Sequence, residues 1–227
     1  RDRDVTGVQT CALPISLSKM PDSGGSDVMK RLTVADLKRS NVPKRFWKAQ
    51  LNAIDQEFEY KEKVATYVEK LEEMMAAGIG LYLWSEANST GKTSLAVVVL
   101  KQALRLRKTA FFEESGRLKS ALVRQDAFEE GQTIERRVRS VDAFVLDDIG
   151  KEYRTDSGYA ESQVESILRD RVQGMKATIM TGNLHPKEIK TVYSPDMAAL
   201  LQEALIPIEV AELDWRVMKE RELRNLL

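Results

Sequence analysis

The chain has 227 residues, of which 43% are hydrophobic and 31% are charged, and its 35 Lys and Arg balance its 35 Asp and Glu. This composition provides enough apolar side chains for one sizeable core and excludes a wholly disordered chain. The sequence lacks the long apolar run that a membrane span needs, so we expect a soluble, cytoplasmic protein. With one Cys and one His, it cannot form a Cys/His zinc cluster or a disulfide framework.

Residues 1–15 read RDRDVTGVQTCALPI, with no apolar period and no capping signal. The string VTGVQTCALPI resembles the conceptual translation of a sequencing-library adapter, so we expect a foreign segment in which Cys11 carries no functional information. A genuine disordered tail is the alternative. Residues 16–27 are rich in Ser, Gly, Asp and Pro, which predicts a flexible linker. We therefore divide the chain into a tail and linker (1–28), a helical lead-in (29–77) and a core (78–227).

The lead-in carries helical signals. Residues 33–50 predict a short helix capped by Thr33, a break at Pro43 and a second short helix. Residues 57–77 predict a longer helix with one apolar stripe, and Gly78 is a typical stop signal.

Beyond the lead-in, short apolar runs alternate with longer amphipathic segments, which is typical of an α/β chain with a parallel sheet. The predicted strands are residues 80–84, 109–112, 143–146, 177–180 and 206–210. The predicted helices are residues 92–107, 116–124, 159–174, 195–204 and 213–226.

The first predicted strand runs into SEANSTGKTS (85–94) and then into a helix, which is the context of a Walker A phosphate loop. Backbone N–H groups of such a loop bind phosphate oxygens. We expect Lys92 to neutralise the β- and γ-phosphates of ATP and Thr93 to offer its hydroxyl to Mg²⁺. Glu86 stands where the full motif has its first glycine, and a carboxylate there repels phosphate unless it points away. The predicted nucleotide-binding residues of the loop are Asn88, Ser89, Thr90, Gly91, Lys92, Thr93 and Ser94.

Two polar strand ends complete the predicted site. The run VDAFVLDDIG ends an apolar strand with two carboxylates, the Walker B pattern, in which Asp147 would hold Mg²⁺ and Asp148 would act as general base. Capping of a following helix is the alternative for such an Asp pair. Asn183 follows the strand at 177–180, where it would bind the γ-phosphate or the attacking water, although an Asn also favours turns there. Lys92, Asp148 and Asn183 are thus the catalytic candidates.

Together, GLYLWSEANSTGKTS, FVLDDIG and QVESILRDRVQGMKATIMTGN resemble the AAA+ helicase-loader family, the DnaC-like ATPases related to the transposition helper IstB and the initiator DnaA, over residues 30–217. The resemblance implies a five-stranded parallel sheet of order 5-1-4-3-2, with ATP bound at the strand ends between neighbouring subunits that self-associate there. It also implies a replicative helicase hexamer and single-stranded DNA as partners. An IstB-like transposition helper, or a nucleotide-binding scaffold with little hydrolysis, remains the alternative.

The resemblance also implies two functional arginines, an arginine finger and a phosphate sensor. Such ATPases usually supply an arginine finger soon after the Asn, but residues 193–203 contain no Arg, which predicts slow hydrolysis. Arg216, within Asp-Trp-Arg, is a candidate phosphate sensor, with a surface arginine as the alternative.

Basic residues are concentrated between Lys101 and Arg139, where the sequence has ten basic and six acidic residues. Loaders contact single-stranded DNA through this part of the core, so this region is the candidate DNA surface, with a solvated helix face as the alternative. The ten are Lys101, Arg105, Arg107, Lys108, Arg117, Lys119, Arg124, Arg136, Arg137 and Arg139.

Overall fold

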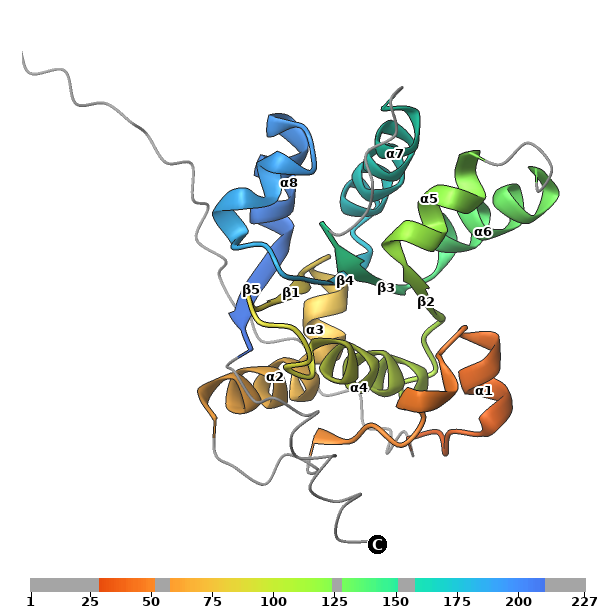
Figure 1. Ribbon diagram of the computed structural model, residues 1–227. Helices are drawn as coiled ribbons and strands as arrows, with labels where there is room; N and C mark the ends of the chain where they lie inside the picture. Colours follow the sequence, from red (N-terminus) through yellow and green to blue (C-terminus); the bar gives the residue numbers. More distant parts are fainter. Residues whose placement is uncertain (1–28, 52–57, 124–127, 151–157, 211–227) are drawn as a thin grey trace, which may run out of the picture.

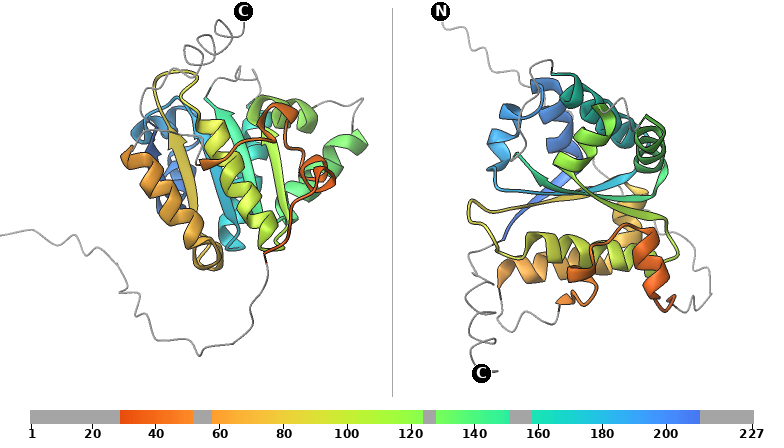
Figure 2. Two further views of the ribbon diagram at one scale, coloured as in Figure 1. Left: turned by 90° about the horizontal axis from the view of Figure 1, so that it is seen from below. Right: turned by 45° about the vertical axis from the view of Figure 1, so that its right-hand side comes forward.

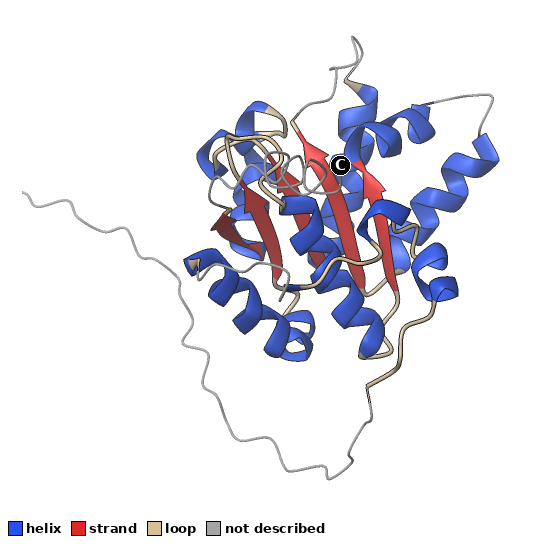
Figure 3. Ribbon diagram, turned by 60° about the horizontal axis from the view of Figure 1, so that its bottom comes forward, coloured by secondary structure: helices blue, strands red, loops and turns tan. Residues whose placement is uncertain are grey.

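The computed structural model describes residues 29–51, 58–123, 128–150 and 158–210, and its centre is a five-stranded, wholly parallel sheet (Figures 1 and 3). The strands are β1 (Gly80–Trp84), β2 (Ala110–Glu114), β3 (Ala143–Ile149), β4 (Ala177–Gly182) and β5 (Leu205–Glu209). They are arranged in the order β2-β3-β4-β1-β5, which is 5-1-4-3-2 from the other edge. The fold class expected from the sequence is therefore confirmed.

Helices cover both faces of this sheet. Figure 2 shows α2 and α4 beneath the sheet, and α5, α6, α7 and α8 above it. The helices are α1 (Val34–Arg39), α2 (Glu59–Glu69), α3 (Leu71–Ala76), α4 (Lys92–Arg105), α5 (Ser115–Val123), α6 (Phe128–Ser140), α7 (Tyr159–Gln173) and α8 (Pro195–Ala204), with 3-10 turns η1 (Lys44–Phe46) and η4 (Pro186–Thr191). Each face buries its own apolar cluster against the strands. None of these helices is long and apolar enough to cross a membrane.

The lead-in packs along α4 and the outer edge of β2. Thr33 caps α1 through a capping box, as its sequence predicts. Beyond α1, the N–H of Phe112 donates to the carbonyl of Ser40 over 2.9 Å, and the side-chain amide of Asn41 donates to the carbonyl of Phe112 over 2.9 Å. The lead-in therefore covers an edge strand that would otherwise expose its backbone groups. The division between lead-in and core stays a prediction.

Two elements differ from the sequence prediction. The single helix expected over 57–77 is two helices, because α2 ends at Glu69 and α3 begins at Leu71. Helix α6 was not predicted, since it is rich in charged residues and only Ile134 and Val138 among its described side chains pack into the apolar cluster. The helix expected over 213–226 lies outside the described residues.

One buried cation fixes the amino-terminal side of the sheet. Arg171 on α7 is fully buried and donates to the carbonyls of Val138, Val141 and Ala177 over 2.6, 2.9 and 2.6 Å, and to the hydroxyl of Thr178 over 3.0 Å. These acceptors lie at the end of α6, before β3 and at the start of β4. The planar guanidinium satisfies several acceptors at once, so it ties α7 to the strands that carry the acidic pair and the Asn.

Candidate functional site

The carboxyl ends of β1, β3 and β4 meet at one edge of the sheet. Gly182 at the end of β4 is the register partner of Trp84 on β1 and of Ile149 on β3. A Cβ on Gly182 would lie only 2.7 Å from Cγ1 of Ile149 and 2.8 Å from the hydroxyl of Tyr82, so glycine permits this close approach. Ligands of open α/β sheets bind at this edge.

The loop between β1 and α4 has left-handed backbone at two positions in its carboxyl half. Gly91 caps α4 with φ 91°, and Ser89 also has positive φ, at 64°. Glycine adopts that conformation readily, whereas Ser89 does so at some cost in strain. The turn leads directly into a 14-residue helix whose first N–H groups and dipole favour an anion.

The side chain of Lys92 folds back onto this loop. Its Nζ donates to the carbonyl of Ala87 over 2.8 Å, to Oγ1 of Thr90 over 3.3 Å and to the carbonyl of Ser85 over 3.4 Å. Lys92 is only 7% exposed. The loop thus holds its cation at the centre of the turn.

Asn183, the residue directly after β4, contacts the same loop. Its Nδ2 donates to the carbonyls of Glu86 and Ala87 over 3.1 Å each. Among the described residues, its Oδ1 is one of the few buried side-chain polar atoms with no hydrogen-bond partner. Glu86, which replaces the first glycine of the motif, is exposed, so this carboxylate is not buried in the loop.

Asp147 is the buried carboxylate of the site. It is 3% exposed, and its Oδ1 accepts hydrogen bonds from the hydroxyls of Thr93 over 2.8 Å and Thr181 over 2.6 Å. Burial raises the pKa of Asp147 above its usual value, and the charges of Asp148 and Glu114 raise it further, while the two hydroxyl donors lower it in part. Ionisation of Asp147 in the folded protein therefore costs electrostatic free energy.

The acidic pair lies on an irregularity of β3. The pairing of β3 with β4 shifts between Leu146 and Ile149, where β3 has one residue more than its partner. Asp148 has φ 64°, and its N–H donates to Oγ1 of Thr181 over 2.9 Å. The bulge therefore changes the direction of the chain at the acidic pair.

The structure brings most of the predicted site residues together. Lys92 and Asn183 share the carbonyl of Ala87, and Thr93 contacts Asp147. The remaining predicted binding residues form the loop and the first turn of α4: Asn88, Ser89, Thr90, Gly91 and Ser94. Arg216 lies outside the described residues.

Sequence reasoning missed Thr181, which contacts Asp147 and the backbone of Asp148. The only signal available was a polar residue within a buried strand, two positions before Asn183. The strand pairing was needed to give it a partner.

The donors present suit Mg²⁺. This ion prefers hard oxygen ligands and is held by one or two carboxylates and a hydroxyl, together with water and phosphate oxygens. Thr93 and Asp147 supply such oxygens within hydrogen-bond distance of each other, and burial of Asp147 favours a nearby cation. The described residues contain no cluster of three or more His, Cys, Asp or Glu side chains, so an all-protein metal cage is absent from them.

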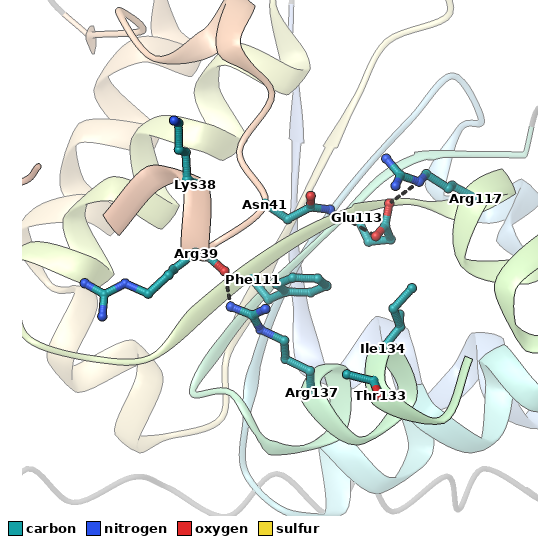
Figure 4. Close-up of a pocket in the computed structure, with 9 residues that line it drawn as sticks. All are labelled: Lys38, Arg39, Asn41, Phe111, Glu113, Arg117, Thr133, Ile134 and Arg137. Carbon is teal, nitrogen blue, oxygen red and sulfur yellow. Dashed lines mark hydrogen bonds and ion pairs between the residues drawn. The ribbon is translucent and has the colours of Figure 1, made fainter. Parts of the chain in front are cut away.

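A concave surface lies at the β2 edge, away from these residues, with a volume of about 460 Å³ (Figure 4). Figure 4 shows the guanidinium of Arg137 beside the ring of Phe111, 4.5 Å from its centre, and Arg117 reaching toward Glu113. We call it the edge pocket. It is lined by Lys38, Arg39, Asn41, Phe111, Glu113, Arg117, Thr133, Ile134 and Arg137.

The structure corrects part of the basic surface predicted over 101–139. Lys101 is buried, and its Nζ donates to the carbonyls of Trp47 and Ala49 over 3.0 and 2.7 Å, so it holds the lead-in. Lys119 is also buried and lies 3.5 Å from Glu161. Neither was a correct candidate for contact with DNA, whereas Arg117 and Arg137 are exposed. Arg124 lies outside the described residues.

No protein-family model matches the sequence, and no curated protein matches it. Solved structures do match. The DnaC helicase loader superposes with a TM-score of 0.64 at 21% identity, over 74% of this chain and 100% of that one. DnaI superposes with a TM-score of 0.64 at 18% identity, over 74% of this chain and 94% of that one.

The replication initiator DnaA bound to AMPPCP and single-stranded DNA superposes with a TM-score of 0.62 at 18% identity. That match covers 80% of this chain but 56% of the DnaA chain, so this chain spans about half of that structure. The chain therefore shares the fold of these structures, and the predicted likeness to DnaC-like and DnaA-like proteins is confirmed at the level of fold.

The raised pKa of Asp147 predicts that Asp147→Asn stabilises the ligand-free protein at neutral pH. The amide keeps an oxygen for Thr93 and Thr181 but removes the buried charge. A raised folded-state pKa means that the ionised group costs stability above that pKa, and that the cost disappears as pH falls through it. Thermal melting at several pH values should show a higher Tm for the variant at neutral pH and a smaller difference in acid. Each kcal/mol of stabilisation raises the Tm by about 2–4 °C.

Asp142→Asn is the matched control of opposite sign. Burial acts to raise the pKa of Asp142, but hydrogen bonds from the N–H and hydroxyl of Thr109 outweigh burial and lower it. This variant should lose stability at neutral pH, and its loss should shrink in acid. Melting of Asp147→Asn below wild type at neutral pH would contradict the cost assigned to Asp147.

Proposed function

We propose that this chain binds and hydrolyses ATP with Mg²⁺, and that it loads a replicative helicase hexamer onto single-stranded DNA. The observation that carries the nucleotide chemistry is the convergence of Lys92, Asp147 and Asn183 at one edge of the sheet, with Thr93 2.8 Å from Asp147. The likeness to the DnaC loader and DnaI, over most of each chain, supports the replication role.

The phosphate loop would bind the triphosphate. The N–H groups of residues 88–94 and the dipole of α4 favour an anion at the turn. Lys92 would exchange the carbonyl of Ala87 for phosphate oxygens, because a buried ammonium gains more from an anion than from a neutral carbonyl. The similar DnaA structure is bound to AMPPCP, an ATP analogue, which supports a nucleotide as the ligand.

Metal binding and activation of the attacking water would fall to the acidic pair and Asn183. Thr93 and Asp147 would hold Mg²⁺, which supplies positive charge to the phosphate oxygens when bound. Asp148 would accept a proton from the attacking water. The free Oδ1 of Asn183 is a hydrogen-bond acceptor, so it suits the water better than a phosphate oxygen.

We expect turnover to be slow. Residues 193–203, which form most of α8 and the segment before it, contain no Arg that could act as a finger on a neighbouring subunit. Lys92 must also leave the carbonyl of Ala87 before it can act on a ligand. These features favour, as second candidate, a nucleotide-binding scaffold with little hydrolysis, and turnover separates the two.

Steady-state phosphate release provides the first test. Wild-type protein should hydrolyse ATP, whereas Lys92→Ala should bind it at least roughly tenfold more weakly because the phosphates lose their cation. Asp148→Asn should keep its ATP affinity and lose about 100-fold or more in kcat. Lys190→Ala, an exposed cation on η4, is the control and should match wild type. ATP binding without Mg²⁺-dependent turnover in wild type would favour the scaffold.

The edge pocket is the best-supported surface for single-stranded DNA. Arg39 and Arg117 have side chains that are 74% and 64% exposed, and Lys38 and Arg137 line the same pocket. Phe111 is buried and its ring faces Arg137, so contact with phosphates suits this surface better than stacking of bases. The similar DnaA structure contains single-stranded DNA.

The double variant Arg39→Gln/Arg117→Gln should weaken binding of an oligo-dT strand, because two phosphate contacts lose their cations. It should also reduce the slope of log affinity against log salt by about 1.4, at roughly 0.7 per contact on a single strand. Lys48→Gln/Lys70→Gln, two exposed cations elsewhere, is the charge-matched control. Fluorescence anisotropy across salt measures both, and equal slopes for the two double variants would exclude the edge pocket.

The loader reading requires a helicase partner. Mixing the chain with the replicative helicase of the same source should give a complex whose mass in solution depends on ATP. Lys92→Ala should form that complex without the dependence on ATP. A complex with a transposase and none with the helicase would instead indicate an IstB-like helper. The same measurement on the chain alone tests self-association through the ATP site.

A further inference from the structure

The hydroxyl of Thr181 contacts both acidic residues of the site. Thr181 lies on β4, is 1% exposed and occupies the position two residues before Asn183. Its Oγ1 donates to Oδ1 of Asp147 over 2.6 Å and accepts from the backbone N–H of Asp148 over 2.9 Å. One side chain thus touches the carboxylate of one residue and the backbone of the next.

The bulge in β3 explains why this contact is needed. In a regular strand, consecutive side chains point to opposite faces of the sheet. The register shift between Leu146 and Ile149 places the acidic pair opposite a single residue of β4. The N–H of Asp148, in left-handed backbone at φ 64°, finds its acceptor in the Thr181 side chain.

We propose that Thr181 is a positioning residue that fixes the orientation of the Asp147 carboxylate relative to the backbone of Asp148. Its hydroxyl sets the rotamer of the group that would hold Mg²⁺. The same hydroxyl holds the bulge that directs the side chain of the general-base candidate. This inference rests on the proposed ATP chemistry and assigns a role within it.

Thr93 does not duplicate this role. Thr93 donates to the same Oδ1 of Asp147 over 2.8 Å, but it acts from the first turn of α4. Among the contacts described for the two threonines, the bond to the backbone of Asp148 belongs to Thr181. Thr181 therefore couples the two acidic residues from within the sheet, and Thr93 couples the acidic strand to the phosphate loop.

Thr181→Val removes the hydroxyl and keeps the β-branched shape. We expect the Mg²⁺ concentration for half-maximal binding of a fluorescent ATPγS analogue to rise by roughly tenfold or more, as for other partners of metal ligands. The kcat for ATP should fall by a similar factor, and affinity for ADP in EDTA should stay at the wild-type value. Thr181→Ser, which keeps the hydroxyl, should restore most of both losses.

Thr178→Val is the matched control on the same strand. It removes another buried hydroxyl, the acceptor for Nε of Arg171 over 3.0 Å at the far end of β4. This variant should have a lower melting temperature than wild type. It should keep the wild-type dependence on Mg²⁺, because Thr178 is remote from the acidic pair. Thr181→Ala replaces the valine variant if the latter does not fold.

Three results would overturn the role of Thr181: a wild-type Mg²⁺ dependence in the variant without the hydroxyl, no recovery in Thr181→Ser, or the same shift in Thr178→Val. These differ from failure of the proposed function. In that case wild-type protein itself would bind the analogue without any dependence on Mg²⁺, or would not bind it, and the role of Thr181 would be rejected with it.

Discussion

The buried carboxylate of Asp147 is the constraint on which the site depends. A charge that is nearly excluded from water must be compensated by donors or by a cation. Here two hydroxyls compensate it in part, one from α4 and one from β4, while Asp148 and Glu114 act against it. The ligand-free arrangement therefore favours a cation, which suits the metal-bound nucleotide that we propose for this edge of the sheet.

That carboxylate stays in place because the sheet is fixed at both ends. At the amino-terminal side, the guanidinium of Arg171 binds carbonyls from α6, from the segment before β3 and from the start of β4, which ties these parts together. At the carboxyl side, Gly182 allows β1, β3 and β4 to approach closely. Between them, a one-residue bulge changes the direction of β3 without breaking the core. A rigid sheet of this kind can hold polar groups in fixed positions at its edge.

The lead-in contributes to the surface as well as to the core. Its backbone covers the edge of β2, and Lys101 secures it by donating to the carbonyls of Trp47 and Ala49. This packing places Lys38 and Arg39 beside Arg117 and Arg137, although these pairs are far apart in the sequence. A neutral chain thereby gathers several cations around one pocket, which is the kind of local charge that attracts a polyanion.

The sequence by itself determined most of the strands, the candidate phosphate loop and the acidic strand end, because each depends on a local pattern, whereas the strand order was expected from the resemblance to a known family. Alternation of apolar runs predicted the strands, and GKT followed by a helix located Lys92 and Thr93. The sequence did not predict α6, whose described side chains make few apolar contacts. It also did not predict the break at Lys70 between α2 and α3. Only the tertiary structure decided that Lys101 and Lys119 are buried and that Thr181 lies opposite the acidic pair. Burial and strand register depend on which segments meet in space, and a local pattern does not contain that information.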